Sequence, residues 1–263
     1  MTPEFSTRDQ SEIERSASEA SKIVVKPVDV DRYLNPQANT PFALEYAFYL
    51  LGNVQGKVVL DLGCGSGETL IPLIRRGASL IGIDLSPDLI AIARRRLSDE
   101  RLSATTYVGS AYETNLSNNS VDVIFCMSLI HHLDIATVRE EMRRILRPGG
   151  VIVLQEPIRF SKAYAFLRSL LPAHEDISEF EHPLTKDEFR TVQAGFLAEG
   201  LRFFRLPFVP LLQRTLPAIG QRSASRLSSW ILTTFPAAAH YATVAVLRLK
   251  KTNSAPNSVT TYE

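Results

Sequence analysis

The chain has 263 residues, two cysteines and a formal net charge of +1 at neutral pH. This charge gives no electrostatic basis for nucleic acid as a main partner, and two cysteines are too few for a disulfide framework or a cysteine-built zinc site. We expect Cys64 and Cys126 to be free thiols in a reducing compartment. The first twenty residues have no apolar core, and no run approaches the ~18 apolar residues that a membrane span needs. We therefore expect a cytoplasmic protein without stable membrane insertion.

Composition along the chain indicates a polar start, one long domain and a polar tail. Residues 1–40 are expected to form a mobile N-terminal segment, because they begin with a stretch rich in Ser, Glu and Arg with little apolar periodicity. Residues 41–250 are expected to form a single domain that opens with a helix at 41–52. Residues 251–263 are expected to form a disordered tail.

From residue 57 onward, apolar runs alternate with helical patterns. Fully apolar runs, as opposed to alternating ones, are typical of a parallel sheet covered by helices on both faces. The predicted strands are 57–61, 79–84, 104–108, 121–126, 151–155, 201–206 and 240–249, and the predicted helices are 67–76, 87–97, 134–146, part of 160–171 and 185–200. The expected fold is α/β, with a doubly wound, mostly parallel seven-stranded Rossmann-like sheet and an antiparallel last strand.

The most informative motif follows the first predicted strand. Asp61 ends that strand, and glycines then occupy every second position, at 63, 65 and 67. The second strand ends in another carboxylate, Asp84. A strand, a glycine turn, a helix, a strand and a terminal acid form the nucleotide-binding half of a doubly wound sheet. Each glycine costs roughly 0.5–1 kcal/mol against alanine in regular structure, which close backbone approach to a ligand explains.

The spacing and charge of this turn argue against a nicotinamide or flavin dinucleotide. The third glycine of the G-x-G-x-x-G fingerprint stands one position early, and Glu68 takes its place. A pyrophosphate needs positive potential at the helix N-terminus, but the turn lies between Asp61 and Glu68 and contains no Lys or Arg. A carboxylate about 4 Å from a phosphate costs roughly 4 kcal/mol at an effective dielectric near 20. The acidic flanks instead favour a phosphate-free cation such as S-adenosylmethionine.

Residues 57–156 resemble the class I S-adenosylmethionine-dependent methyltransferases, of the small-molecule type. The matching segments are Leu60–Gly67, Gly82–Ser86, Val121–Ile124, Ile130–Leu133 and Leu146–Gly150. The resemblance implies S-adenosylmethionine as cofactor, S-adenosylhomocysteine as product, and no metal. The residues that it places at the cofactor are Asp61, Gly63, Cys64, Gly65 and Gly67 at the methionine end, Asp84 at the ribose, Leu85 at the adenine, and Met127 and Ser128 beside the methionine portion. Ser110 and Ala111 stand where the family usually has an Asp that reaches the adenine amino group.

Two adjacent histidines are the candidate catalytic residues. His131 and His132 follow the fourth strand, at the sheet edge where sites form. One of them could be a general base, since imidazole titrates near neutral pH. The alternative is that they pack against the following helix. Glu156, His174 and His182 are weaker candidates, and the run Arg94–Arg96 is expected to be a solvated helix end.

Two apolar insertions, at about 157–184 and 207–236, suggest a lid. If strand 201–206 is parallel to the others, both insertions leave the carboxyl edge, above the cofactor. Together with the helix at 41–52, which carries Phe42, Tyr46 and Phe48, they would cover an apolar acceptor pocket; the alternative is that they pad the sheet.

The sequence therefore predicts methyl transfer from S-adenosylmethionine to an O, N or C atom of a small, apolar acceptor. Methylation of a protein or lipid, a nicotinamide-dependent oxidoreductase and a non-catalytic S-adenosylmethionine-binding scaffold remain as alternatives. The oligomeric state stays open.

Overall fold

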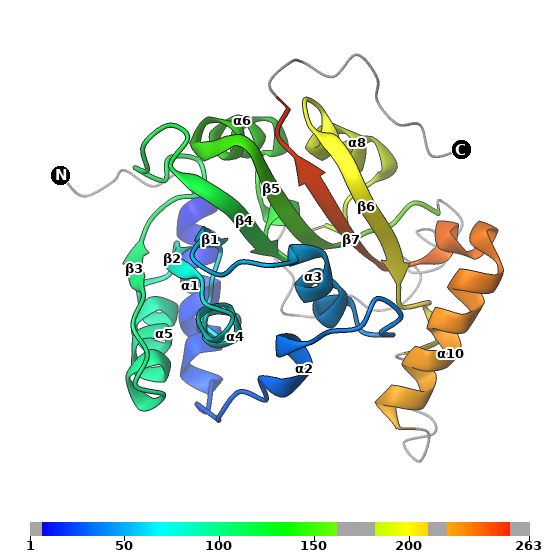
Figure 1. Ribbon diagram of the computed structural model, residues 1–263, viewed down its shortest axis with the longest axis horizontal. Coiled ribbons are helices and arrows are strands. Elements are labelled where there is room, and N and C mark those ends of the chain that lie inside the picture. Colours follow the sequence, from blue (N-terminus) through cyan, green and yellow to red (C-terminus); the bar gives the residue numbers. More distant parts are fainter. Residues whose placement is uncertain (1–6, 162–181, 210–219, 253–263) are drawn as a thin grey trace.

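A seven-stranded sheet forms the centre of the molecule, in a computed structural model that describes residues 7–161, 182–209 and 220–252 (Figure 1). The strands are β1 Val58–Leu62, β2 Ser79–Asp84, β3 Thr105–Val108, β4 Val121–Met127, β5 Leu146–Pro157, β6 Leu197–Phe204 and β7 Val244–Lys250. Their order is β3-β2-β1-β4-β5-β7-β6. Only β7 runs against its neighbours among these strands. The expected α/β fold with an antiparallel last strand is confirmed.

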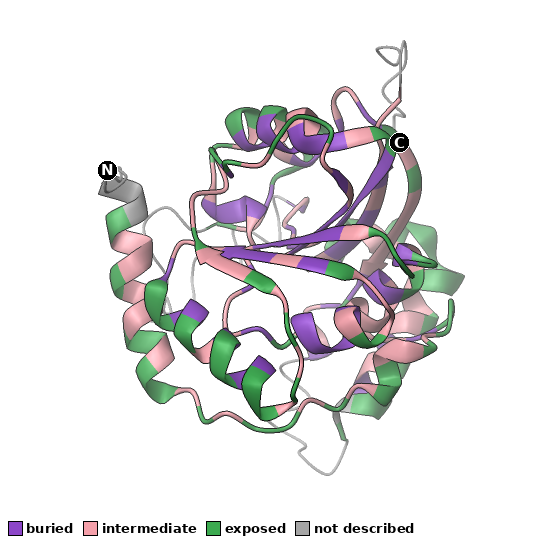
Figure 2. Cartoon of the chain, turned by 60° about the vertical axis from the view of Figure 1, so that its left-hand side comes forward, coloured by how far each residue is buried: buried purple, intermediate pink, exposed green. Residues whose placement is uncertain are grey.

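Helices cover both faces of the sheet, as its apolar strands require. The helical elements are α1 Thr7–Lys22, α2 Asp31–Leu34, α3 Ala43–Leu51, α4 Leu70–Arg75, α5 Pro87–Asp99, η1 Ile130–His132, α6 Ile135–Ile145, α8 Lys186–Gln193, α10 Gln221–Thr234 and η2 Pro236–Tyr241. One core lies between the sheet and α3, α4 and α5, and the other lies between the sheet and α6 and α8. Figure 2 shows buried residues running through the strands and along the inner sides of these helices.

The direction of β6 decides where its following insertion leaves the sheet. Because β7 is antiparallel to both β5 and β6, β6 points the same way as β1–β5. The condition for the predicted lid is therefore met. Residues 162–181 and 210–219 of the two insertions lie outside the described residues, so the lid and the domain boundaries stay predictions.

Several elements differ from the sequence expectation. Helix α1 lies within the segment expected to be mobile and packs against α5; its sixteen residues are mostly polar, so their pattern gave no helix signal. The predicted helix 185–200 ends at Gln193, because Gly195 takes a positive φ of 85° and β6 begins at Leu197. A 3-10 helix occupies the start of the predicted last strand.

Candidate cofactor and active site

A cavity of about 370 Å³ lies at the carboxyl edge of β1, β2 and β4. Parallel sheets of this kind bind ligands at that edge, where the strand order reverses. Nine of the eleven expected cofactor residues line it: Gly63, Cys64, Gly65, Asp84, Leu85, Ser110, Ala111, Met127 and Ser128. His132 lines it as well, whereas Asp61, Gly67 and His131 do not. The structure thus brings together residues from four segments far apart in the sequence.

The three glycines of the turn serve different purposes. Gly63, at φ 75°, donates its N–H to the Ile83 carbonyl over 2.8 Å, and so ties β1 to β2. Gly67, at φ 83°, lets α5 approach: a Cβ there would lie 2.8 Å from that of Ala93. Gly65, at φ 50°, borders the cavity, and a Cβ there would meet no protein atom within 4 Å. Gly65 therefore leaves its backbone open to a ligand.

Asp84 ends β2 with its carboxylate at the cavity wall. One carboxylate oxygen accepts from the Gly65 N–H at 2.8 Å, and the other accepts from the Ser86 N–H at 2.9 Å. A carboxylate has about four acceptor positions, so acceptor capacity remains for two hydroxyl groups. Burial raises the pKa of Asp84, against the lowering effect of these two hydrogen bonds. Such a carboxylate fits the vicinal hydroxyls of a ribose.

Asp61 lies below the glycine turn and is 1% exposed. Its carboxylate accepts a hydrogen bond from the Thr69 hydroxyl. Burial raises its pKa to about 7, and the nearby Asp84 carboxylate adds to the rise. Asp61 does not line the cavity, so direct contact with the cofactor remains a prediction.

The charge of the cavity wall is acidic. Glu12, Glu19, Glu68 and Asp84 stand against one arginine in the wall, Arg15, which lies 3.3 Å from Glu12, and one arginine behind it, Arg96, which lies 3.6 Å from Glu68. Acidic walls disfavour a pyrophosphate and favour a cation. The donor set, the bare backbone at Gly65 and the free acceptor capacity of Asp84 all fit S-adenosylmethionine.

Helix α1 supplies part of this wall, which the sequence did not indicate. Glu12, Arg15, Ser16 and Glu19 of α1 line the cavity, and Ile23 lines it just after the helix. A helix without a strong apolar stripe is stabilised by tertiary contact more than by its own sequence. Only the fold therefore places it over the cavity.

The two histidines lie beside a buried glutamate. Glu156, at the end of β5, accepts from the Leu129 and Ile130 N–H groups at 3.0 and 2.9 Å through one oxygen. Its other oxygen lies 2.8 Å from His131 Nδ1. The two imidazole rings lie 4.0 Å apart between centroids, tilted by 43° to each other, and His132 reaches the cavity wall. Glu156 therefore fixes both the backbone of the turn and the orientation of His131.

Ser128 begins this turn in a strained conformation. It has a positive φ of 55°, and its N–H donates to the Gln155 carbonyl over 2.7 Å. A non-glycine residue at positive φ costs energy that the surroundings must supply. Strain of this kind at a cavity wall is consistent with a site that needs this backbone shape.

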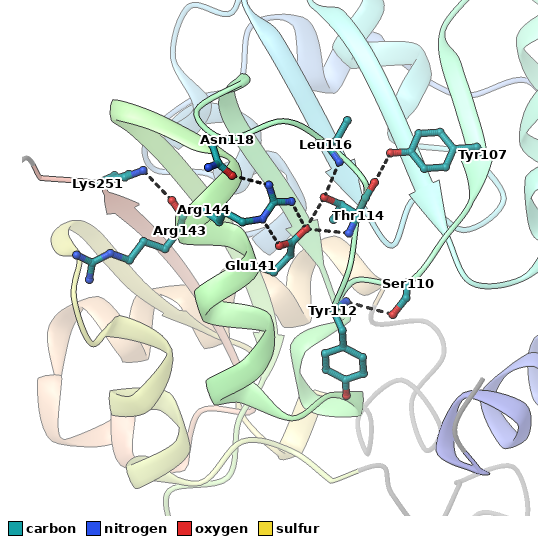
Figure 3. Close-up of polar contacts among 10 residues, drawn as sticks. All are labelled: Tyr107, Ser110, Tyr112, Thr114, Leu116, Asn118, Glu141, Arg143, Arg144 and Lys251. Atoms are coloured by element: carbon teal, nitrogen blue, oxygen red, sulfur yellow. Dashed lines mark hydrogen bonds and ion pairs between the residues drawn. The ribbon is translucent and has the colours of Figure 1, made fainter. Parts of the chain in front are cut away.

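A network around Glu141 anchors the loop that carries Ser110 and Ala111 (Figure 3). Glu141 accepts from the backbone N–H and the hydroxyl of Thr114, at 2.8 and 2.6 Å, and from two nitrogens of Arg144. Burial acts to raise the pKa of Glu141, but these hydrogen bonds outweigh it, so the pKa is lowered. The network holds the far end of this loop on α6.

Arg96 corrects one expectation for the run Arg94–Arg96. Its side chain is 4% exposed, not solvated. Its guanidinium donates to the Ser66 carbonyl of the glycine turn at 3.1 Å and to the Lys26 carbonyl at 2.7 Å. Arg96 therefore joins the turn to the segment that follows α1.

Several other expected features can be placed. The thiols Cys64 and Cys126 are both buried, and burial raises the pKa of each. Within the described ranges, no group of three metal-ligating side chains occurs and no helix has the length and apolar character to cross a membrane. His182 lies 3.0 Å from Glu188 near α8, away from the cavity wall, and His174 lies outside the described residues.

Comparison with known proteins agrees with this site. A family profile described as "Methyltransferase domain" matches residues 59–150. The chain is 28% identical over 184 residues to the ubiquinone biosynthesis O-methyltransferase of Alkalilimnicola ehrlichii, covering 66% of this chain and 73% of that protein. Residues 59–150 are thus a methyltransferase domain, and the class I S-adenosylmethionine-dependent methyltransferases are the family that the chain resembles. The enzyme of the same name from Psychrobacter arcticus is 32% identical over 171 residues, which span 60% of this methyltransferase and 65% of the relative, just under two thirds.

Solved structures share the fold of this methyltransferase. Geranyl diphosphate C-methyltransferase from Streptomyces coelicolor A3(2), in complex with Mg²⁺, geranyl diphosphate and S-adenosylhomocysteine, superposes with a TM-score of 0.63 at 15% identity, over 95% of this chain and all of that chain. The [4+2]-cyclase SpnF superposes with a TM-score of 0.56 at 19% identity, over 79% of this chain and 81% of that chain. Since proteins of one fold can differ in chemistry, these likenesses bear on architecture alone.

Proposed function

We propose that this methyltransferase transfers a methyl group from S-adenosylmethionine to an oxygen atom of a small, largely apolar acceptor. The acidic cavity with Asp84 and the open backbone of Gly65 carries the cofactor part of the proposal. The choice of oxygen rests on the printed names of the curated relatives.

The cofactor supplies an electrophilic methyl group on a sulfonium when bound. The residues of this chain then have to align the acceptor, exclude water and take up a proton. His132 lies at the cavity wall and is the candidate base for the acceptor hydroxyl. Glu156 contacts Nδ1 of His131 and so fixes the orientation of its imidazole ring. We assign His131 and Glu156 a positioning role, because neither lines the cavity.

Turnover with radiolabelled S-adenosylmethionine tests this proposal. The purified chain is incubated with a panel of phenols, catechols and aliphatic alcohols, and with a lipid extract and a protein extract in separate arms. We expect labelled product from a small hydroxylated acceptor, with S-adenosylhomocysteine formed in equal amount. The His132→Gln variant should lose kcat while the Kd for S-adenosylhomocysteine stays unchanged.

Other outcomes distinguish the alternatives. Tight cofactor binding with no labelled product in any arm would contradict the proposal and favour a non-catalytic scaffold. Label confined to the protein or lipid extract would replace the small acceptor by a larger one. NADH oxidation with a carbonyl panel, in the absence of cofactor binding, would indicate an oxidoreductase.

A further inference from the structure

A second hollow, on the α2–α3 side of the sheet, is rich in arginine. It has a volume of about 840 Å³ and lies between the loop that precedes α3 and helix α10, beside the β6 edge (Figure 1). We call it the arginine groove. Its lining includes Arg32, Arg202, Arg222, Arg226, Phe42 and Trp230.

The charge of the arginine groove differs from that of the rest of the chain. Four guanidinium groups meet one carboxylate, that of Glu45, and Glu45 is already engaged by Arg32 at 2.6 Å. Arg222 and Arg226 are exposed and have no ion-pair partner within the described parts of the chain. A concave surface with an excess of one charge concentrates ligands of the opposite charge. This cationic groove therefore contrasts with the acidic cofactor cavity.

Arg202 shows that the positive charge is built into the fold. Its guanidinium lies over the rings of Tyr46 and Phe204, at 5.2 and 4.8 Å from their centroids. It donates to the Ala38 carbonyl and the Ser229 hydroxyl, both at 2.7 Å, and no carboxylate neutralises it among the described residues. Burial lowers its pKa. A half-buried cation held by neutral groups retains its charge for a further, anionic partner.

A smaller pocket lies between the groove and the strand next to the cofactor cavity, because Gln155 in its lining is the cross-strand partner of Met127, which lines that cavity. This pocket, of about 290 Å³, shares Arg32 and Phe42 with the groove, and Gln155, Phe204 and Val244 also line it. Gln155 Oε1 is buried without a hydrogen-bond partner among the described residues. The pocket therefore extends from the groove to within one strand of the cofactor cavity.

The sheet register gives the distance between the cofactor cavity and the groove. Met127, Gln155, Val246 and Arg202 are paired in succession across β4, β5, β7 and β6, so their side chains share one face. Met127 lines the cofactor cavity and Arg202 lines the arginine groove. Three strand spacings separate them, which is about 14 Å. A single elongated molecule can span that distance.

We propose that the arginine groove binds the anionic end, a phosphate or a carboxylate, of the methyl acceptor. The apolar body of the acceptor then lies in the pocket beside Gln155 and its methylated atom reaches the cofactor cavity. The acceptor is thus an amphipathic anion whose charged group lies about 14 Å from the reacting atom. This inference rests on the proposed function and adds the class of acceptor to it.

The single tryptophan of the chain provides a direct probe, since Trp230 lines the groove and is 57% exposed. Tryptophan fluorescence is titrated with octyl phosphate, octan-1-ol and octyltrimethylammonium, with S-adenosylhomocysteine saturating. We expect octyl phosphate to change the emission saturably, with at least about tenfold tighter binding than either of the other two probes. Octanoate should behave like octyl phosphate if carboxylates are accepted.

Charge reversal at exposed positions identifies the site. Arg226→Glu and Arg222→Glu should each weaken octyl phosphate binding by about tenfold or more, because a favourable charge becomes a repulsive one. Arg95→Glu, at a 74% exposed arginine on α5, is the matched control and should bind as the parent does. Calorimetry of S-adenosylhomocysteine should give the same Kd in all four proteins.

The outcomes separate this inference from the proposed function. Equal affinity for octyl phosphate and octan-1-ol, or an unaltered Kd in Arg226→Glu, would overturn the groove assignment while leaving methyl transfer intact. Emission changes with phosphatidylglycerol vesicles but not with monomeric octyl phosphate would assign the groove to a membrane surface instead. If the parent protein does not bind S-adenosylhomocysteine, the proposed function is refuted, independently of whether the groove binds octyl phosphate.

Discussion

The substitution Asp61→Asn should change how the stability of the protein depends on pH. Asp61 is fully buried under the glycine turn, with the Thr69 hydroxyl as its hydrogen-bond partner. Its pKa is raised from 3.8 to about 7 by burial. Asparagine has nearly the same shape and can still accept from Thr69, but it does not ionise. The variant therefore isolates the cost of the buried charge.

The sign follows from the raised pKa. The folded state binds the Asp61 proton more tightly than the unfolded state, so the favourable contribution is complete below pH 3.8 and is lost as pH rises through about 7. A rise of about 3 pKa units corresponds to about 4 kcal/mol over the whole range, and to about 3 kcal/mol between about pH 5 and pH 8. Because asparagine does not ionise, Asp61→Asn should not lose this contribution to the free energy of unfolding.

Urea denaturation of both proteins at several pH values between about 5 and 8 measures the effect. Groups distant from Asp61 titrate alike in the two proteins, so the difference between their free energies of unfolding reports Asp61 together with its coupling to Asp84. As pH rises across this range, the free energy of unfolding of Asp61→Asn should increase by about 2–3 kcal/mol relative to that of the parent. Parallel curves for the two proteins would refute the buried, near-neutral titration of Asp61.

Two further substitutions test the supports of the cofactor cavity. Glu141→Gln should cost about 1–3 kcal/mol at neutral pH, because Arg144 and Thr114 lose their charged acceptor. Since the pKa of Glu141 is lowered in the fold, that difference should be present above pH 4.5 and disappear as pH falls below it; chemical denaturation of both proteins at pH 7 and pH 3 would reveal a pH-independent difference if this is wrong. Arg96→Ala should cost about 1.5–3 kcal/mol and weaken S-adenosylhomocysteine binding, since it frees the Ser66 carbonyl of the turn. Arg95→Ala on the same helix, at an exposed arginine, should stay within about 0.5 kcal/mol of the parent in denaturation, and equal losses in both variants would contradict the role of Arg96.

Strong local patterns explain why the sheet and much of the cavity could be predicted. Strands β1, β2 and β4 and the middle of β5 are mostly apolar runs, and the glycine spacing identifies Asp61 and Asp84 as the acids at or next to the ends of β1 and β2. Ser86 caps α5 by accepting the Leu89 N–H, and Thr185 forms the expected capping box with Glu188. In each case the signal lies within a few residues of the feature that it predicts.

Features that depend on contacts between distant segments could not be predicted this way. Helix α1 lines the cavity and contacts α5, and its polar sequence does not indicate these contacts. Arg96 sits in an arginine run typical of a solvated helix end, yet the fold turns it under the glycine turn. Phe48, expected in the lid, is fully buried against Phe125 in the core. The arginine groove is assembled from α2, the loop that precedes α3, α3, β6 and α10, so no motif marks it.

Calorimetric titration of S-adenosylmethionine into the parent protein and into Asp84→Ala tests the central claim most directly. We expect one molecule bound per chain by the parent, no binding of NADH, and a Kd raised by about ten- to 150-fold in Asp84→Ala, equivalent to about 1.5–3 kcal/mol of lost charge-assisted hydrogen bonds. An unchanged Kd in the variant, or preferential binding of NADH by the parent, would contradict the assignment of this cavity to a phosphate-free adenosyl cofactor.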